Sequence, residues 1–320
     1  MRDLNQRRMR YFFEVWQHRS VRGAAETLNT APSVITRQIK LLEEEVGIKL
    51  FDRQSRGVEP TEAAHLLLEF WHGCQAQQEH FEERLRALSG LQDGNIRIAL
   101  SEGYIDILNS KVLGEFSRAY PGIKISLDIL PLDSVLNEVA SGKAHFGIAY
   151  NPSIRDDVSY IASCKQPIKL LLRPNHALTT LEQPADLKNI LKFPIAIMPT
   201  DYGIGQALQY VFHMENIPLN PAFTTNSLAA LRHYVLNTDA VTFIGEFSVL
   251  SDIASGRLTT LEINNDILNS IYGRLVTKKI SSLSPAATEL IKWILERMEI
   301  FSSNVKLMCA EKTGGFNLVN

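Results

Sequence analysis

Two short amphipathic segments joined by a tight turn, within residues 20–47, constrain the fold of this chain more than any other feature. In the first segment, small and apolar residues follow the i, i+3, i+4, i+7 spacing of one buried helical stripe: Val21, Ala24, Ala25 and Leu28. Ser20 precedes this stripe and is a good N-cap residue, so the helix should begin there. Asn29 follows the stripe, and asparagine tolerates the left-handed conformation that ends a helix in a tight turn.

The second segment, predicted to begin around residues 30–32, has two chemically different sides. Its apolar side is formed by residues at helical spacing: Ile35, Ile39, Leu42 and Val46. Its opposite side carries Ser33, Arg37 and Lys40, with Thr36 on the flank. Such a pair of helices is typical of a helix-turn-helix, whose second helix enters the major groove of DNA. An ordinary solvated face is the alternative for this helix taken alone.

The next stretch, GIKLFDRQSRGVEPT, predicts two short strands around a turn. Arg53 and Arg56 lie near the tip of this hairpin. A basic hairpin after a helix-turn-helix forms a wing, which contacts phosphates or the minor groove and positions the protein on DNA. Residues 1–60 are therefore expected to form a mainly helical, winged helix-turn-helix domain.

Charge is unevenly distributed along the chain. Residues 1–60 contain 11 Lys and Arg against 8 Asp and Glu, a net charge of +3. The whole chain contains 33 and 35 of these residues, so the remainder carries 22 against 27, a net charge of −5. A basic unit attached to an acidic body indicates that the first part contacts a polyanion.

A long connecting helix is predicted over residues 61–93, because the chain from Thr61 to Leu88 has no proline and a single glycine. Steps of four and three residues define a heptad seam interrupted by Gln78. Its other members are expected at a dimer interface: Leu67, Trp71, Cys74, Phe81, Leu85 and Leu88. Packing on the chain's own body is the alternative. His65, Glu69 and His72 share a face of this helix, which more often indicates a solvated face than a metal site.

From residue 94 onward, short apolar runs alternate with helical stretches, which predicts an α/β fold with mostly parallel strands. Ligands of such sheets bind beyond the carboxyl ends of strands, at helix N-termini. Polar turns and strand ends at these positions predict a ligand cleft formed by Ser101, Glu102, Gly103, Tyr104, Tyr150, Thr200, Asp201, Tyr202, Thr225, Asn226, Gly245 and Phe247.

Two features of this predicted cleft are open to alternative interpretations. Ser101, Thr200 and Ser227 could simply cap their helices. The backbone N–H groups suit a carboxylate or another anion, whereas Glu102 and Asp201 could complement helix dipoles or meet an amine of the ligand.

Several classes of protein are disfavoured by what the sequence lacks. The sequence contains no run of about 18 apolar residues, so no transmembrane helix is expected. The charged start lacks the apolar core of a signal peptide, so a cytoplasmic location is expected. Three widely separated cysteines form neither a disulfide framework nor a zinc spacing. No motif of a hydrolase, a P-loop or a metalloprotease is present. We expect no enzymatic activity, no catalytic residues, no metal and no cofactor.

Ordered motifs extend over nearly the whole chain: SVRGAAETL, ITRQIKLLEEEVGIKLFDR and PTEAA, then GNIRIAL, YPGIKISL, VASGKAHFGIAY and RPNHAL. With these motifs the chain resembles the LysR-type transcriptional regulators. The family often has glutamine where Pro32 stands, so base contacts are expected to shift toward Ser33, Val34, Thr36 and Arg37.

The resemblance implies a winged helix-turn-helix, a linker helix and two α/β lobes similar to periplasmic solute-binding proteins. Lobe I is expected at about 94–162 and 268–302, lobe II at about 163–267, and a loosely ordered tail at 303–320. The implied partners are double-stranded DNA, a small organic effector for which a carboxylate is one candidate, and further copies of the chain in a homodimer or homotetramer. The alternative function is a bilobed small-molecule binder or enzyme whose basic head mediates assembly.

Overall fold

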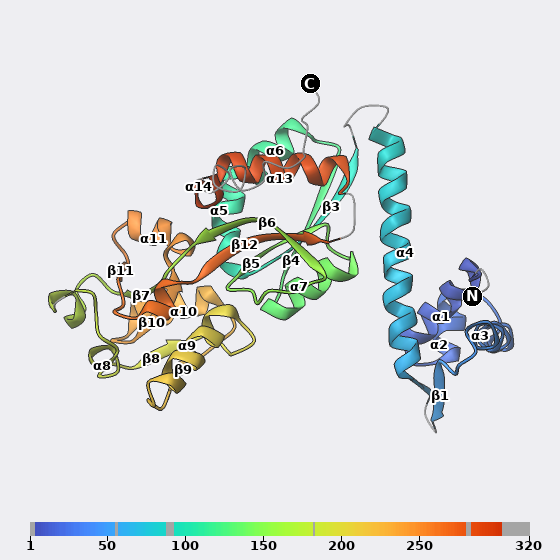
Figure 1. Cartoon of the computed structure of the whole chain (residues 1–320), viewed down its shortest axis with the longest axis horizontal. Helices are drawn as coiled ribbons and strands as arrows, with labels where there is room; N and C mark the ends of the chain where they lie inside the picture. Colours follow the sequence, from blue (N-terminus) through green and yellow to red (C-terminus); the bar gives the residue numbers. More distant parts are fainter. Residues whose placement is uncertain (1–3, 55–56, 88–92, 182, 280–282, 303–320) are drawn as a thin grey trace. The chain divides into compact units, whose positions relative to one another are not determined.

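The structure, a computed structural model, describes residues 4–54, 57–87, 93–181, 183–279 and 283–302 (Figure 1). The chain divides into two compact units, residues 1–79 and 80–320. Arg56, Leu88 and the predicted tail at 303–320 lie outside the described residues. Within those residues, no helix is long and apolar enough to cross a membrane.

The N-terminal unit contains the predicted helix-turn-helix. Ser20 caps the second helix by accepting a hydrogen bond from the Gly23 N–H, at 3.3 Å, and Asn29 adopts the expected positive φ of 46°. Phe12, Ile35 and Leu42 are fully buried where the helices meet. Val46 is 37% exposed, so the apolar stripe of the third helix ends one turn earlier than expected. The elements are α1 (Gln6–His18), α2 (Val21–Thr27), α3 (Pro32–Val46), β1 (Phe51–Gln54) and β2 (Gly57–Pro60).

The wing, formed by β1 and β2, is fixed to the helices by three hydrogen bonds. Glu43 of α3 accepts hydrogen bonds from the backbone N–H groups of Leu50, at 2.9 Å, and of Phe51, at 3.4 Å. The Val58 N–H donates to the carbonyl of Arg19, at 3.0 Å. The neighbouring Gly57 has φ 115°, and a Cβ there would lie 2.5 Å from the same carbonyl oxygen, so only glycine fits.

The C-terminal unit contains two mixed five-stranded sheets, which define its two lobes. The first lobe has the strand order β4-β3-β5-β12-β6 and the second β11-β7-β10-β8-β9. Four of the eight strand pairings within these sheets are parallel and four antiparallel, which corrects the expectation of mostly parallel strands. The antiparallel pairs arise because β12 returns to the first sheet and β7 is inserted into the second after a crossing between lobes.

Helices cover both faces of the first sheet. Ile98 of β3 packs in the cluster that includes α13, whereas the adjacent Ala99 packs with α7, as the alternation of a strand requires. The elements of this lobe are β3 (Gly94–Leu100), η1 (Glu102–Tyr104), α5 (Ile105–Leu108), η2 (Asn109–Leu113), α6 (Gly114–Ala119), β4 (Ile123–Ile129), α7 (Leu132–Ser141), β5 (Phe146–Tyr150), β6 (Val158–Lys165), β12 (Tyr272–Lys278), α13 (Pro285–Arg297) and α14 (Glu299–Ser302).

The chain crosses from the first lobe to the second after β6. That strand was not predicted, and because it continues to Lys165 the crossing lies later than the expected boundary at 162/163. The elements of the second lobe are β7 (Ile168–Leu172), η3 (Ala177–Thr180), α8 (Leu187–Ile190), β8 (Ile195–Ile197), α9 (Gly203–Met214), β9 (Phe223–Thr224), α10 (Leu228–Asn237), β10 (Val241–Gly245), η4 (Glu246–Ser248), α11 (Leu250–Ala254), β11 (Thr259–Leu261) and α12 (Asp266–Asn269).

Candidate functional site

Helix α3 presents its predicted polar face to solvent. Four of the predicted DNA-binding residues on it are exposed: Pro32, Ser33, Arg37 and Lys40. Val34 is 39% exposed beside them, which leaves an apolar surface for contact with a base. Thr36 is half-buried, and its hydroxyl donates to the Pro32 carbonyl at 3.0 Å, so this hydroxyl is already engaged within the helix.

The wing lies beside α3 across an open groove. Arg53 is placed on β1, opposite Val58 of β2. The groove between α2, α3 and the wing is lined by Arg22, Lys40 and Lys49, among other residues. Sequence reasoning missed Arg22 and Lys49, because only the packing of the wing against the helices brings these two cations together with Lys40.

The predicted seam on α4 (Glu62–Ala87) divides into two parts with different surroundings. Leu67 is buried and Trp71 half-buried against the core of the N-terminal unit, as the alternative interpretation expected. Cys74 is half-buried. Phe81 and Leu85 are 61% and 50% exposed, so this part of the seam has apolar side chains in solvent.

Two histidines of α4, His65 and His72, pack against aromatic side chains of the same unit. The ring of His65 contacts Trp16 edge-on, with 6.3 Å between centroids, and His72 contacts Phe13 in the same way at 5.9 Å. Among the described residues, no group of three or more His, Cys, Asp or Glu side chains is placed to hold a metal ion.

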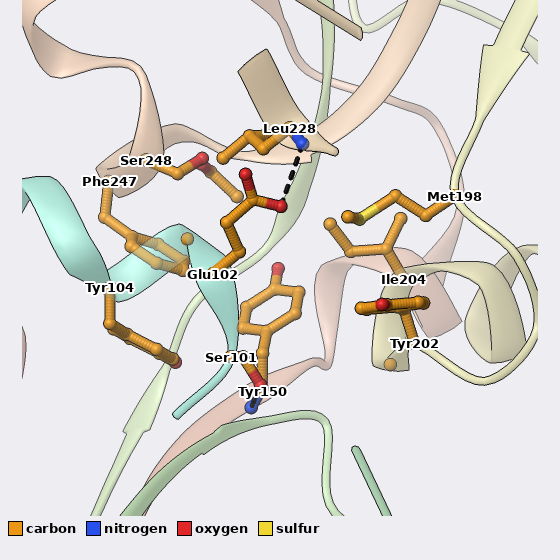
Figure 2. A pocket seen from close by; sticks show the side chains of 13 residues that line it. Ser101, Glu102, Tyr104, Tyr150, Met198, Tyr202, Ile204, Leu228, Phe247 and Ser248 are labelled. Atoms are coloured by element: carbon orange, nitrogen blue, oxygen red, sulfur yellow. Dashed lines mark hydrogen bonds between the residues drawn. The ribbon is translucent and has the colours of Figure 1, made fainter. Parts of the chain in front are cut away.

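A small cavity lies between the two lobes, at the carboxyl ends of β3, β5, β8 and β10 (Figure 2). Its volume is about 40 Å³. Eight of the residues predicted to bind a ligand line it: Ser101, Glu102, Gly103, Tyr104, Tyr150, Tyr202, Gly245 and Phe247. Gly203 and four residues that the sequence did not single out complete the wall: Met198, Ile204, Leu228 and Ser248.

Aromatic rings from both lobes form part of this wall. Tyr104 of the first lobe stacks on Phe247 of the second, with 4.6 Å between centroids and an interplanar angle of 17°. The hydroxyls of Tyr104 and Tyr150 both donate to Gln166, to its Oε1 and its backbone carbonyl respectively, each at 2.7 Å. Burial, with smaller contributions from Tyr150 and Cys164, raises the pKa of the Tyr104 hydroxyl well above its usual value. The two hydroxyls are therefore neutral donors that are already engaged.

The polar residues of the cavity make one contact between the lobes and one within the first lobe. Glu102 of the first lobe accepts a hydrogen bond through Oε2 from the backbone N–H of Leu228, at the start of α10, at 2.9 Å. Ser101 accepts through Oγ from the Tyr150 N–H, at 3.3 Å, and makes no capping bond to its own helix. Ser101 therefore occupies the N-cap position without the side-chain bond that a capping role would provide.

Four residues predicted to face a ligand do not line the cavity. Thr200, Asp201 and Asn226 are exposed, and the hydroxyl oxygen of Thr225 accepts from the N–H of Ser227 at 3.2 Å. After β8 the chain passes through a turn before α9 begins at Gly203, so Thr200 and Asp201 lie on the outside of this turn.

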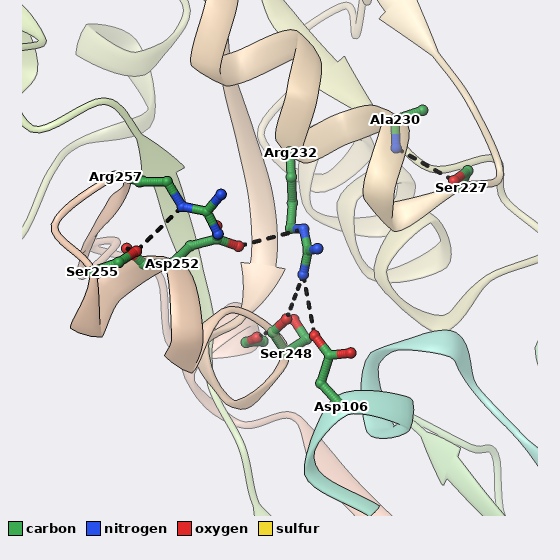
Figure 3. Close-up of polar contacts among 9 residues, drawn as sticks. Asp106, Ser227, Ala230, Arg232, Ser248, Asp252, Ser255 and Arg257 are labelled. Atoms are coloured by element: carbon green, nitrogen blue, oxygen red, sulfur yellow. Dashed lines mark hydrogen bonds and ion pairs between the residues drawn. The ribbon is translucent and has the colours of Figure 1, made fainter. Parts of the chain in front are cut away.

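A second contact between the lobes involves Arg232 of α10 (Figure 3). Its guanidinium forms an ion pair with Asp106 of the first lobe, at 3.3 Å, and lies 3.4 Å from Asp252 of α11. The carboxylate of Asp252 is buried and is also paired with Arg257, at 2.6 Å. Glu102 and Asp106 lie four residues apart in the first lobe, and Leu228 and Arg232 lie four residues apart in the second. The two carboxylates of the first segment therefore pair with the two donors of the second.

Comparisons with protein families match most of the chain. The family model described as the LysR substrate binding domain matches residues 89–299. A second, described as the bacterial regulatory helix-turn-helix protein of the lysR family, matches residues 6–65.

Individual proteins with similar sequences are transcriptional regulators by name. The chain is 22% identical over 289 residues to the RuBisCO operon transcriptional regulator of Allochromatium vinosum, covering 90% of this chain and 95% of the relative. It is 27% identical over 308 residues to the SDS degradation transcriptional activation protein of a Pseudomonas species, and this match covers 92% of this chain and 96% of the relative.

Solved structures support the fold. A full-length OxyR variant from Pseudomonas aeruginosa has a TM-score of 0.70 at 16% identity and covers 94% of this chain and 98% of its own. Full-length CbnR, in a complex with its target DNA, has a TM-score of 0.62 at 16% identity, and the match covers 91% of this chain and 99% of CbnR.

Proposed function

We propose, because the chain belongs to the LysR family of transcriptional regulators, that α3 and the wing recognise a specific DNA site and that a small effector binds in the cavity between the lobes. The regulator function and the effector-binding domain follow from the family. We propose in addition which residues contact DNA, which residues contact the effector, and how copies of the chain associate.

The exposed face of α3 is the observation that supports DNA recognition by named residues. Arg37 is exposed there, on the side opposite the buried Ile35 and Leu42, and a guanidinium can bond two acceptors of guanine in the major groove. Lys40 and Lys49 line the groove next to the wing, where they suit contacts with phosphates. With DNA as its partner, the protein acts in the cytoplasm.

The cavity supports the effector site because residues far apart in sequence meet there. Its wall combines Glu102 and Tyr104 of the first lobe with Tyr202, Leu228 and Phe247 of the second. A ligand that touches both lobes changes the free energy of the closed arrangement relative to an open one, which is the physical requirement for an effector.

Self-association is proposed for the exposed part of the α4 seam. Phe81 and Leu85 lie at (i, i+4) on one side of this helix, and burying such side chains against a second copy would remove them from water. Two copies related by a two-fold axis would present two α3 helices to a two-fold DNA site. The homotetramer implied by the resemblance stays a prediction.

DNA recognition by Arg37 can be tested with duplexes that the protein selects from a random pool. Arg37→Ala should cost about 1–3 kcal/mol on a selected duplex and change affinity for random duplexes little. Lys49→Ala is the matched control, and it should weaken binding to both duplexes equally and lower the salt slope by about one unit.

Fluorescence anisotropy at several salt concentrations measures both affinities. Equal losses on selected and random duplexes would refute base recognition by Arg37. A wild-type protein without preference for any duplex would favour the alternative of a bilobed small-molecule binder or enzyme.

A further inference from the structure

The N-terminus of α10 is already occupied by a carboxylate of the chain itself (Figure 2). Oε2 of Glu102 accepts from the N–H of Leu228, which is the first residue of this helix and therefore has no partner within it. A carboxylate at this point also meets the positive end of the helix dipole. The position that would suit an anionic group of a ligand is therefore filled.

The rest of the cavity wall carries mostly aromatic and aliphatic side chains, with the hydroxyls of Ser101 and Ser248, and no positive charge. Among the described residues, no lysine, arginine or histidine lines the cavity. Arg232 contacts the carbonyl of Ser248, at 3.5 Å, but its guanidinium is shared between Asp106 and Asp252. An anionic ligand would therefore approach Glu102 without a compensating cation, and two like charges in one small site repel each other.

We infer, building on the effector site proposed above, that the ligand of this cavity carries a small organic ammonium group held by Glu102 and the surrounding aromatic rings. Oε1 of Glu102 accepts no hydrogen bond from the described residues and is available to an ammonium N–H. Aromatic rings attract cations through their quadrupole, and cages of such rings are a recurrent site for ammonium ligands. Tyr104, Tyr150 and Phe247 supply three rings within 6.5 Å of one another.

The size of the cavity limits what enters it. A volume of about 40 Å³ holds roughly three water-sized groups, since each needs about 10–15 Å³. This is enough for an ammonium nitrogen with one or two carbons. A larger molecule, including a three-carbon amine, would place only its cationic end here.

Three probes of similar length and different charge test the inference: propylammonium, propanoate and 1-propanol. Ligand-observed NMR titrations of the full chain at constant ionic strength measure the three dissociation constants. We expect propylammonium to bind about tenfold or more tightly than propanoate, with 1-propanol in between, because a hydrogen bond to a charged group is the strongest contact on offer. This comparison uses the wild-type protein and depends on no variant.

Two variants locate the binding site. Glu102→Gln keeps the size and shape of the side chain and should lower propylammonium affinity about tenfold, while Asp201→Asn removes an exposed carboxylate outside the cavity and should change nothing. Ile204→Phe adds volume at the cavity wall and should weaken all three probes.

The possible results separate the ligand class from the location of the site. Propanoate binding that is preferred in the wild type and lost in Ile204→Phe would overturn the ammonium inference and leave the effector cavity intact. Propylammonium binding that neither Glu102→Gln nor Ile204→Phe changes would overturn both. The absence of propylammonium binding at 100 mM would also overturn the inference.

Discussion

Replacing Arg232 with alanine should destabilise the C-terminal unit more than removal of any well-exposed arginine. The guanidinium lies between Asp106, whose side chain is 59% exposed, and Asp252, whose side chain is 3% exposed. Oδ2 of Asp252 accepts no hydrogen bond from the described residues, so the Arg232 Nε at 3.4 Å compensates its charge only electrostatically. Arg257, which pairs with the other oxygen, would remain in the variant.

These two pairs contribute unequally to the expected loss. Breaking a buried pair costs about 3–5 kcal/mol when the remaining charge is uncompensated, whereas an exposed pair contributes about 0–1 kcal/mol. Because Arg257 still compensates Asp252, we expect about 2–3 kcal/mol in total for Arg232→Ala. For a unit of this size, each kcal/mol lowers Tm by about 2–4 °C, so the melting temperature should fall by about 4–12 °C.

Urea denaturation followed by tryptophan fluorescence and near-UV circular dichroism measures the free energy of unfolding. The matched control is Arg173→Ala, because Arg173 pairs with Asp239, whose side chain is 76% exposed. That control should lose less than about 1 kcal/mol. A loss for Arg232→Ala within 0.5 kcal/mol (about the error of such a measurement) of the control would refute the electrostatic reasoning.

Three further predictions concern the wing, the second lobe and α4. Glu43→Ala should destabilise the N-terminal unit by about 1–3 kcal/mol, measured by thermal denaturation of the full chain, because the wing loses two hydrogen bonds to a charged acceptor. Burial raises the pKa of Glu246, but the hydrogen bonds from Lys169 and Thr260 and the charge of Lys169 together outweigh it, so the net pKa is lowered. The stability that Glu246 contributes should therefore be present above the ordinary glutamate pKa and be lost as pH falls through the lowered value, and Lys169→Met should raise that pKa in a carbon-detected NMR titration. Substitution of Phe81 and Leu85 by glutamate should yield monomers in sedimentation, and an unchanged assembly would contradict the proposed role of the α4 seam.

The helices of the N-terminal unit were predictable because one period governs each of them. Ile35, Ile39 and Leu42 recur at helical spacing in α3 and are all buried. The seam on α4 shows the limit of this reasoning, because Leu67 satisfies the heptad spacing and yet packs in the core of its own unit. Spacing indicates which side of a helix is buried and does not indicate the partner.

Strands were predicted where apolar residues are continuous and missed where they are sparse. β5 (Phe146–Tyr150) is buried at every position, whereas in β6 (Val158–Lys165) only Val158 and Ala162 are buried. β9 and β11 have two and three residues, too few for a pattern to emerge.

The cavity was predicted where the chain goes directly from a strand into a helical turn. Ser101 follows β3 immediately and lines the cavity. After β8 an extra turn intervenes, so Met198 and Ile204 line the wall in place of Thr200 and Asp201. The path of such a turn depends on how the lobes pack, which local sequence does not specify.

The most direct test of DNA recognition by α3 is a double-perturbation cycle on a selected duplex. Each guanine is replaced in turn by 7-deazaguanine, which lacks the N7 acceptor that an arginine bonds in the major groove, and affinities are measured for the wild type and Arg37→Ala. We predict that at one guanine the wild type loses about 1–3 kcal/mol, while Arg37→Ala loses nothing further from the same replacement. If the losses from the two changes add at every guanine, Arg37 does not contact a base and the proposed mode of recognition is wrong.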